Sequence, residues 1–194
     1  MLGIQTQLFE GQDIRLGPID HDLHPAIESM WTHNSEFMRL MEMKPVRPLS
    51  PALVKKEYES IEKRMEEDHN SYYFTIRTRK DDRLIGKAIL QWIDWANGQG
   101  WLRLGIGAAE DRRRGLGSQA MRLLLRFAFA ELNLYRVSAL APEYNQGAIG
   151  ILCKFGFAEE IRRRQAVERD GHRSDLLTYG LLRPEWESRI KLDG

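Results

Sequence analysis

The amino-acid sequence predicts an α+β fold in which helices flank a central mixed, mostly antiparallel sheet. Three apolar runs separated by short polar turns predict an antiparallel meander. They cover residues 72–78, 84–92 and 101–107. A strand–helix–strand pattern follows over residues 101–141, and an Asp170–Gly171 turn between two further runs predicts a closing hairpin. The 194 residues are most simply one domain, 1–194, with a peripheral tail from about residue 187.

Composition and charge are those of an ordinary globular protein. Apolar residues make up 42% of the chain and charged residues 29%, and the formal net charge is +1. A nearly neutral chain has no overall field that favours nucleic acid or a membrane surface. Cys153 is the single cysteine, so no intrachain disulfide can form, and no apolar run approaches the ~18 residues of a membrane span. With no signal peptide visible, a cytoplasmic protein is expected.

The first part of the chain predicts one strand and three helices. Residues 13–19 alternate polar and apolar side chains and predict a strand. Asp20 is the expected N-cap of a helix with an apolar stripe. A short helix and a loop are expected over the methionine-rich residues 33–49. Ser50 and Pro51 supply the N-cap and the first-turn proline of a charged helix that ends near residue 67.

Beyond the meander, the sequence predicts alternating helices and strands. A helix is expected over residues 115–132, and an apolar strand over 135–141 is expected to lie centrally and parallel to the strand before it. Asn145 is the expected N-cap of a short helix that ends at Gly156. The hairpin strands are expected over residues 157–168 and 176–182. No regular element is predicted after Pro184.

A loop rich in glycine and arginine joins the third meander strand to the long helix. A helix N-terminus leaves backbone N–H groups unpaired and, together with the helix dipole, favours an anion such as a phosphate. Glycines allow close backbone approach, and arginines add fork-shaped donors for phosphate oxygens. These residues are Arg112, Arg113, Arg114, Gly115 and Gly117. The local prediction is a phosphate-cradling loop, and the alternative is a solvated basic turn.

Two motifs of this sequence resemble those of the GNAT superfamily of N-acetyltransferases. The loop has the form Arg112-x-x-Gly115-x-Gly117, which is similar to the Q/R-x-x-G-x-G/A acetyl-CoA loop of that superfamily. One strand later, residues 145–157 resemble a second family pattern through their asparagine, alanine, lysine and Gly-Phe positions. The terminal hairpin resembles the branch that includes ribosomal-protein-alanine and spermidine acetyltransferases. The resemblance covers the chain from about residue 8 to residue 186.

This resemblance implies a sheet that splays open around acetyl-CoA, the expected co-substrate. Backbone groups of Gly105, Ile106 and Gly107 would then contact the pantetheine arm. The pyrophosphate would lie on Arg112, Arg113, Arg114, Gly115, Leu116, Gly117 and Ser118. Asn145 and the helix that it starts would line the far side of the cofactor.

The implied reaction transfers an acetyl group to the primary amine of a small molecule or a protein N-terminus. The amine attacks the thioester directly in a ternary complex, where positioning supplies much of the acceleration. A backbone N–H near Ile106 or Gly107 is the candidate donor to the oxyanion. The sequence departs from the family at Leu152, where many members carry a tyrosine acid, and at Arg103, where many carry a glutamate. Cys153 does not replace the tyrosine, because adjacent helical residues point ~100° apart.

The remaining catalytic candidates are few. They are Asn145, Tyr144, Asp94 and Glu143. Asp94 lies near the end of the second meander strand, where a family substrate would lie, and its alternative role is that of a turn residue. No cluster of His, Cys, Asp or Glu has metal-ligand spacing, so no metal is expected.

Two other functions stay open. The absence of the tyrosine at Leu152 fits a non-catalytic acyl-CoA-binding or sensing domain of the same fold. RNA binding by residues 112–114 is the weaker alternative, because no wider basic surface accompanies these arginines. Neither nucleic acid nor a membrane is an expected partner. The C-terminal hairpin is a candidate homodimer interface, as in several relatives.

Overall fold

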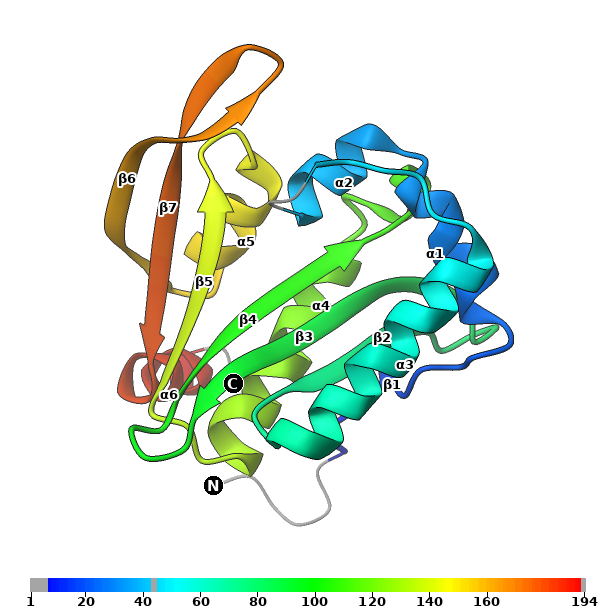
Figure 1. The fold of residues 1–194 in the computed structure, drawn as a ribbon. Helices are drawn as coiled ribbons and strands as arrows, with labels where there is room; N and C mark the ends of the chain where they lie inside the picture. The colour runs from blue at the N-terminus through cyan, green and yellow to red at the C-terminus, as the bar shows by residue number, and fades with distance from the viewer. Residues whose placement is uncertain (1–6, 43–44, 193–194) are drawn as a thin grey trace.

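A seven-stranded sheet organises the protein (Figure 1), and the computed structural model describes residues 7–42 and 45–192. The strand order is β1-β2-β3-β4-β5-β7-β6. The strands are β1 Ile14–Gly17, β2 Tyr72–Thr78, β3 Leu84–Asp94, β4 Gln99–Ile106, β5 Arg136–Pro142, β6 Ala158–Arg169 and β7 His172–Leu182. The helices are α1 His24–Thr32, α2 Ser35–Met41, α3 Pro51–Asp68, η1 Ala109–Asp111, α4 Leu116–Arg126, η2 Phe127–Glu131, α5 Gln146–Lys154 and α6 Arg183–Leu192. The expected mixed, mostly antiparallel sheet is confirmed.

Helices cover both faces of this sheet. α4 packs on one face against β1, β3 and β4, and its apolar stripe forms the main core. α1 and α3 lie on the other face, where Val54 and Tyr58 of α3 bury Tyr73 of β2. α2 lies across the upper end of the sheet in Figure 1, between α1 and α5. In the described part of the chain, no helix is long and apolar enough to cross a membrane.

The sheet opens between its two central strands. β4 and β5 pair in parallel over 99–101 and 136–138 alone, and β5 then pairs with β7 along its whole length. β4 continues to Ile106 on its own side, so the two strands diverge in a V (Figure 1). Both the parallel, central position expected for the 135–141 strand and the splayed sheet are confirmed. The edge of β4 that faces the V keeps backbone groups that no neighbouring strand uses.

Side chains cap the helices of the N-terminal half. The Ser50 side chain accepts a hydrogen bond from Leu53 N at 3.3 Å, which confirms the expected N-cap of α3. The expected N-cap role of Asp20 is wrong, because Asp20 Oδ1 accepts from Leu23 N at 2.8 Å in a turn that precedes the helix. α1 therefore begins four residues later, at His24. The expected segment 33–49 contains α2, while its residues 43–44 lie outside the described residues.

The C-terminal region contains a helix that the sequence did not predict. The long helix expected over 115–132 is α4 followed by the π-helical turn η2. The Arg183 guanidinium donates to the Phe129 carbonyl at 2.6 Å and to the Leu134 carbonyl at 2.9 Å, which satisfies carbonyls at the end of this turn. α6 begins at Arg183, and the Trp186 ring lies 5.1 Å from the Phe129 ring. This contact attaches the start of α6 to the core.

Candidate active site

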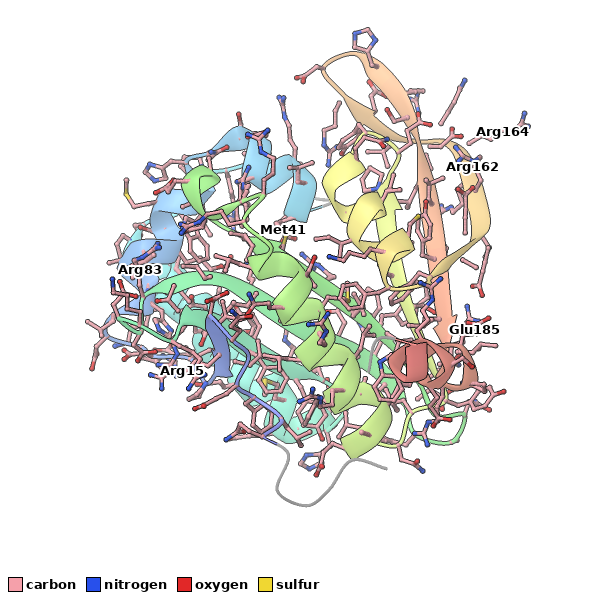
Figure 2. The ribbon with its side chains drawn as sticks, turned by 180° about the vertical axis from the view of Figure 1, so that it is seen from behind. Arg15, Met41, Arg83, Arg162, Arg164 and Glu185 are labelled. Atoms are coloured by element: carbon pink, nitrogen blue, oxygen red, sulfur yellow. The ribbon has the colours of Figure 1, made fainter. Side chains whose placement is uncertain are left out.

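The open end of the V is where the glycine–arginine loop, α2 and the start of α5 meet. The loop over residues 107–115 leads from β4 into α4. Met41, labelled in Figure 2, is the last residue of α2, and its thioether lies against Gly105 near the end of β4. The V therefore has three walls, which are the end of β4, the first turn of α4, and the β5–α5 connection. α2 spans the gap between β4 and β5 on the opposite face from α4.

Glycines at the end of β4 let α1 and α2 sit directly on the strand. A Cβ atom on Gly105 would overlap the Met41 thioether, and a Cβ atom on Gly107 would overlap the Trp31 indole ring. Side chains at these two positions are therefore incompatible with the observed packing. This packing role was not predicted. The expected contacts of Gly105, Ile106 and Gly107 with pantetheine stay a prediction.

Arg112 turns back onto the strand. Its Nε donates to the Ile106 carbonyl at 3.2 Å and its Nη2 to the Gly107 carbonyl at 2.7 Å. Its Nη1 also lies 3.3 Å from Glu36 Oε2 of α2. Three donors of the Arg112 guanidinium therefore shape the loop and join it to α2. A direct role of the Arg112 side chain toward phosphate stays a prediction.

Arg113 and Arg114 project outward from the same loop. Arg113 has φ +57° and Gly115 has φ +81°, so both residues adopt the left-handed backbone conformation. The Arg114 side chain is 63% exposed, and its Nη1 lies 3.6 Å from Asp111 Oδ1. These two guanidinium groups remain available to an anion at the loop.

Asp111 anchors the loop to the meander, and sequence reasoning did not find it. Arg83, in the turn before β3, donates two hydrogen bonds to its carboxylate at 2.7 and 2.8 Å. These bonds lower the pKa of Asp111 against the opposing effect of burial. The Asp111 side chain is 1% exposed. The pair fixes the base of the loop while its tip stays solvated.

No side chain in the described part of the chain caps the first turn of α4. Its N-cap is Gly115, which has no side-chain oxygen to offer. Leu116 is buried, and Gly117 lies beside Ile151 of α5, where an added Cβ atom would be 3.3 Å from Ile151 Cδ1. Ser118 is half-buried in the same turn. The N–H groups of this turn therefore point toward the open end of the V with no capping side chain among the residues that the structure describes.

The far wall is held to α2 by two side chains. Asn145 Oδ1 accepts from Ala148 N at 3.1 Å, which confirms the expected N-cap of α5. Asn145 Nδ2 also donates to the Leu40 carbonyl at 3.3 Å, and the Tyr144 hydroxyl donates to the Arg39 carbonyl at 3.3 Å. The structure thus places Asn145 and Tyr144, two of the candidate catalytic residues, together at the open end (the mouth) of the V, on the side of β5.

A family model described as an acetyltransferase (GNAT) domain matches residues 13–158. The chain belongs to the GNAT family. The probable N-acetyltransferase YjcK of Bacillus subtilis is 32% identical over 134 residues, which cover 69% of this chain and 73% of that protein. The putative ribosomal N-acetyltransferase YdaF of the same organism is 34% identical over 107 residues, covering 55% and 58%.

Solved structures show the same fold. The spermidine N-acetyltransferase from Vibrio cholerae, in complex with CoA and spermine, matches with a TM-score of 0.77 at 17% identity, covering 90% of this chain and 98% of that one. The fold, the family and the names of the relatives agree with the branch that the terminal hairpin indicated. The chain is a GNAT N-acetyltransferase, and acetyl transfer is its general chemistry.

Asp94 lies at the other end of the sheet from the GNAT loop. It pairs with Gln99 at the start of β4, whereas the loop follows Ile106 at the end of that strand. Its carboxylate accepts from Asn97 N at 3.1 Å and from Asn97 Nδ2 at 2.7 Å, and these bonds lower the pKa of Asp94. The structure does not bring Asp94 to the other candidates, and its contacts are those of a turn residue.

Leu152 and Arg103, the two residues at which the sequence departs from the GNAT pattern, have different surroundings in the structure. Leu152 is 3% exposed and belongs to the main core, whereas Cys153 beside it is exposed. Arg103 projects from β4 toward α2, where its Nη2 donates to the Met41 carbonyl at 2.6 Å and to Glu42 Oε1 at 2.8 Å. Sequence reasoning missed Glu42, because 61 positions separate it from Arg103.

A buried polar cluster supports α1 on the sheet. Glu28 accepts hydrogen bonds from Lys87 at 2.6 Å and from Tyr58 at 2.5 Å. Burial raises the pKa of Glu28, but Lys87 and the tyrosine hydroxyls outweigh it, so the pKa is lowered. Lys87 pairs with Gly105 across β3 and β4, so this cluster fixes α1 beside the end of β4. Among the described residues, no group of three His, Cys, Asp or Glu could hold a metal ion.

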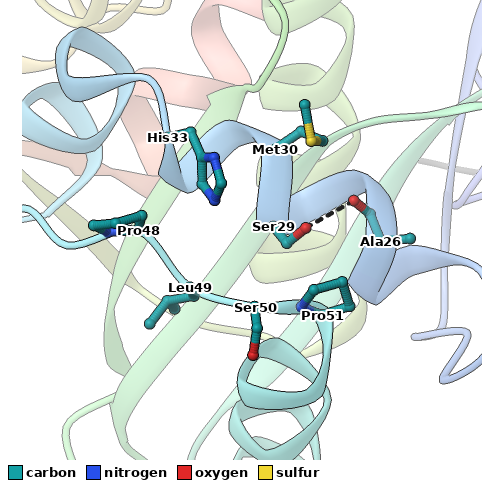
Figure 3. A pocket seen from close by; sticks show the side chains of 8 residues that line it. All are labelled: Ala26, Ser29, Met30, His33, Pro48, Leu49, Ser50 and Pro51. Carbon is teal, nitrogen blue, oxygen red and sulfur yellow. Dashed lines mark hydrogen bonds between the residues drawn. The ribbon is translucent and has the colours of Figure 1, made fainter.

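A separate surface pocket of about 560 Å³ lies between α1 and the start of α3 (Figure 3). Its lining is mostly apolar. The Ser29 hydroxyl in it donates to the Ala26 carbonyl at 2.9 Å, and the Ser50 hydroxyl caps α3. The polar groups of this pocket are thus already used within the protein, apart from His33 at its rim. No step of acetyl transfer is assigned to it.

Proposed function

We propose that this GNAT domain transfers the acetyl group of acetyl-CoA to a primary amine, either on a small molecule or at a protein N-terminus. The observation that carries the proposal is the uncapped start of α4 at the open end of the V. Its free N–H groups, together with Arg113 and Arg114, match the charge and geometry of a pyrophosphate. Residues 112–118, as predicted from the sequence, would hold the pyrophosphate. Arg112 would contribute indirectly, because its side chain binds the backbone carbonyls that set the shape of the loop.

The end of β4 suits the pantetheine arm and the thioester. Gly107 N donates to the Ile85 carbonyl at 2.8 Å, so this N–H points toward β3. Successive N–H groups of a strand point to opposite sides, so the N–H of Ile106 faces the V. Of the two predicted oxyanion donors, Ile106 is therefore the one that we propose. Asn145, on the far wall, would bound the cofactor on its other side.

The reaction that we propose is direct attack within a ternary complex. The ammonium of the acceptor loses a proton, its nitrogen attacks the thioester carbonyl, and the C–S bond breaks as the amide forms. The second proton of the nitrogen ends on the thiolate of CoA. We propose that this proton passes through Tyr144, because Leu152 cannot serve: the Tyr144 hydroxyl gives its proton to the thiolate, and the phenolate takes the second proton of the nitrogen. Asp94 takes no part in the proposed reaction, since it lies at the opposite end of β4.

The test is release of the CoA thiol, followed with a thiol reagent against a panel of primary amines and N-terminal peptides. Transfer to at least one amine, lost in a variant with glutamate at Arg114, is the expected result. Tight binding of acetyl-CoA with no transfer to any member of the panel would contradict the proposal. That outcome would favour the alternative function, which is acyl-CoA binding or sensing, in line with the buried Leu152.

We also propose a homodimer formed through the C-terminal hairpin. β6 lies at the edge of the sheet and is exposed along most of its length, and an exposed edge strand is a template for pairing. A related spermidine N-acetyltransferase from Vibrio cholerae has a dodecameric structure. Light scattering of the purified protein would measure the mass. A monomeric mass across the accessible concentration range would contradict this proposal.

A further inference from the structure

The end of α2 brings a carboxylate to the place where the GNAT strand glutamate is missing. Arg103 stands two residues before Gly105 on β4 and on the same face of the strand. Its guanidinium holds Glu42 Oε1 at 2.8 Å and the Met41 carbonyl at 2.6 Å. Glu42 thus reaches this face of β4 from α2 rather than from the strand itself.

Glu42 lies next to the segment that we propose for the thioester arm. Met41 precedes it, and the Met41 thioether covers Gly105 so closely that a Cβ atom on that glycine would overlap it. The Glu42 side chain is 28% exposed, so solvent and an acceptor can reach it. Within the described residues, Glu42 Oε2 has no hydrogen-bond partner, whereas Oε1 is bound by Arg103. One oxygen is therefore held in place and the other is available.

Most other carboxylates near the open end of the V are already bound within the protein. Glu28 is buried on Lys87, Asp111 is bound by Arg83, and Asp170 is bound at both oxygens by Arg39. Glu36 lies on Arg112 at the other end of α2. Glu143 accepts from Asp175 N at 3.0 Å and lies 3.6 Å from Arg162. Glu36 and Glu42 each keep one oxygen without a partner among the described residues, but Glu42 is held at 2.8 Å beside the end of β4, whereas Glu36 is 70% exposed and held at 3.3 Å.

We propose that Glu42 is a catalytic residue that receives the ammonium of the acceptor and takes its proton. The inference rests on the acetyl-transfer function proposed above. The ammonium donates to Oε2, and one N–H proton passes to the carboxylate and then to solvent. The neutral amine attacks the thioester, the C–N bond forms, the C–S bond breaks, and the second proton of the nitrogen goes to the CoA sulfur. Arg103 is the positioning residue of this step.

The charges around Glu42 come from two strands. Arg103 faces its carboxylate from β4, and Arg169 of β6 reaches its main-chain carbonyl with Nη2 at 3.5 Å. Arg103 binds one oxygen of Glu42 and leaves the other without a partner among the described residues, so this second oxygen is the one that can accept from an ammonium.

The test compares two acceptors of similar size, ethylamine and 2,2,2-trifluoroethylamine. Ethylamine is almost fully protonated at neutral pH, whereas the fluorinated amine is largely neutral. In Glu42→Gln, kcat/KM for ethylamine should fall by about 100-fold or more, the usual range for loss of a general base. The fluorinated amine should lose less than about one tenth of that factor. Glu62→Gln is the matched control, since Glu62 is half-exposed and bound to His21 at 2.7 Å.

Equal losses for both amines in Glu42→Gln would overturn the proposal, because a merely structural role would lower both rates alike. An unchanged rate for ethylamine would overturn it as well. If Glu42→Gln does not fold, Glu42→Asp keeps the carboxylate and should show an intermediate loss confined to ethylamine. Absence of transfer by the wild-type protein to every primary amine of the panel, these two included, with acetyl-CoA bound, would contradict the proposed function and with it this inference.

Discussion

Charge reversal at Arg114 is the sharpest perturbation of the proposed cofactor site. The Arg114 side chain is 63% exposed, and its one ion-pair contact among the described residues is Asp111 at 3.6 Å. Replacing it by glutamate should therefore leave the fold intact. Gly115 is a poorer target, because its φ of +81° would strain any other residue. Arg47→Glu is the matched control, since Arg47 is 72% exposed and also lies 3.6 Å from one carboxylate, that of Glu57.

The size of the effect follows from the ligand and from the exposure of the arginine. Acetyl-CoA at ~100 times its Kd should stabilise the wild-type protein by about 2.7 kcal/mol. For a chain of this length, that is a Tm increase of about 5–11 °C. Removing one charge at ~4 Å from a phosphate in a water-like medium and adding the opposite one costs about 2 kcal/mol, or a ~30-fold weaker Kd. The variant should then keep only about 0.9 kcal/mol, a shift of ~2–3 °C.

Differential scanning calorimetry at physiological salt, with and without acetyl-CoA, measures these shifts directly. The Arg47→Glu control should keep the full wild-type shift. A shift in Arg114→Glu equal to that of the control would refute the assignment of Arg114 to the pyrophosphate. No shift in the wild-type protein at millimolar acetyl-CoA would refute the cofactor site as a whole, and the loop would then be a solvated basic turn.

Three further perturbations test the packing, the anchor and the chemistry of the site. Gly105→Val should lower the free energy of unfolding by about 1–3 kcal/mol in urea, because its side chain would overlap Met41. Arg83 lowers the folded-state pKa of Asp111 below 3.8, so this carboxylate stabilises the fold above that pH and loses its effect as the pH falls through the folded-state pKa. Asp111→Asn should therefore lower the free energy of unfolding at neutral pH and make it fall less steeply as the pH is lowered. Identical pH profiles for the two proteins would show that the pair with Arg83 does not stabilise the fold. Tyr144→Phe should lower kcat by about 100-fold at an unchanged KM for acetyl-CoA, and an unchanged kcat would exclude its hydroxyl as the acid.

Local patterns in the sequence were sufficient to predict most of the sheet. Apolar alternation and turn residues placed the meander, and the helix after the loop made β5 parallel to β4, as observed. The splay of the sheet followed from the family resemblance. In the structure it corresponds to the end of pairing after Trp101 and Ser138. The end of the helical segment after α4 was less predictable, because the Arg183 side chain donates a hydrogen bond to the Phe129 carbonyl, and these residues are 54 positions apart.

The orientation of the three loop arginines could not be predicted from the sequence. Arg112 turns inward and the next two residues turn outward because Arg113 adopts φ +57°, a conformation that composition does not reveal. The position of α2 was equally inaccessible. It is fixed by pairs such as Arg39 with Asp170, 131 positions apart, and Arg103 with Glu42. Contacts between such distant, partly exposed residues leave no periodic signal in a single sequence.

Arg103 and Glu42 are best understood as one unit. An arginine alone on this face of β4 would repel a cationic acceptor at the point where it must reach the thioester. A glutamate alone at the end of a seven-residue helix would have no fixed position. Together they hold a carboxylate oxygen at 2.8 Å from the guanidinium and leave the other oxygen without a partner among the described residues. The loss of the strand glutamate is therefore compatible with amine chemistry, because the charge that the acceptor meets is supplied by α2.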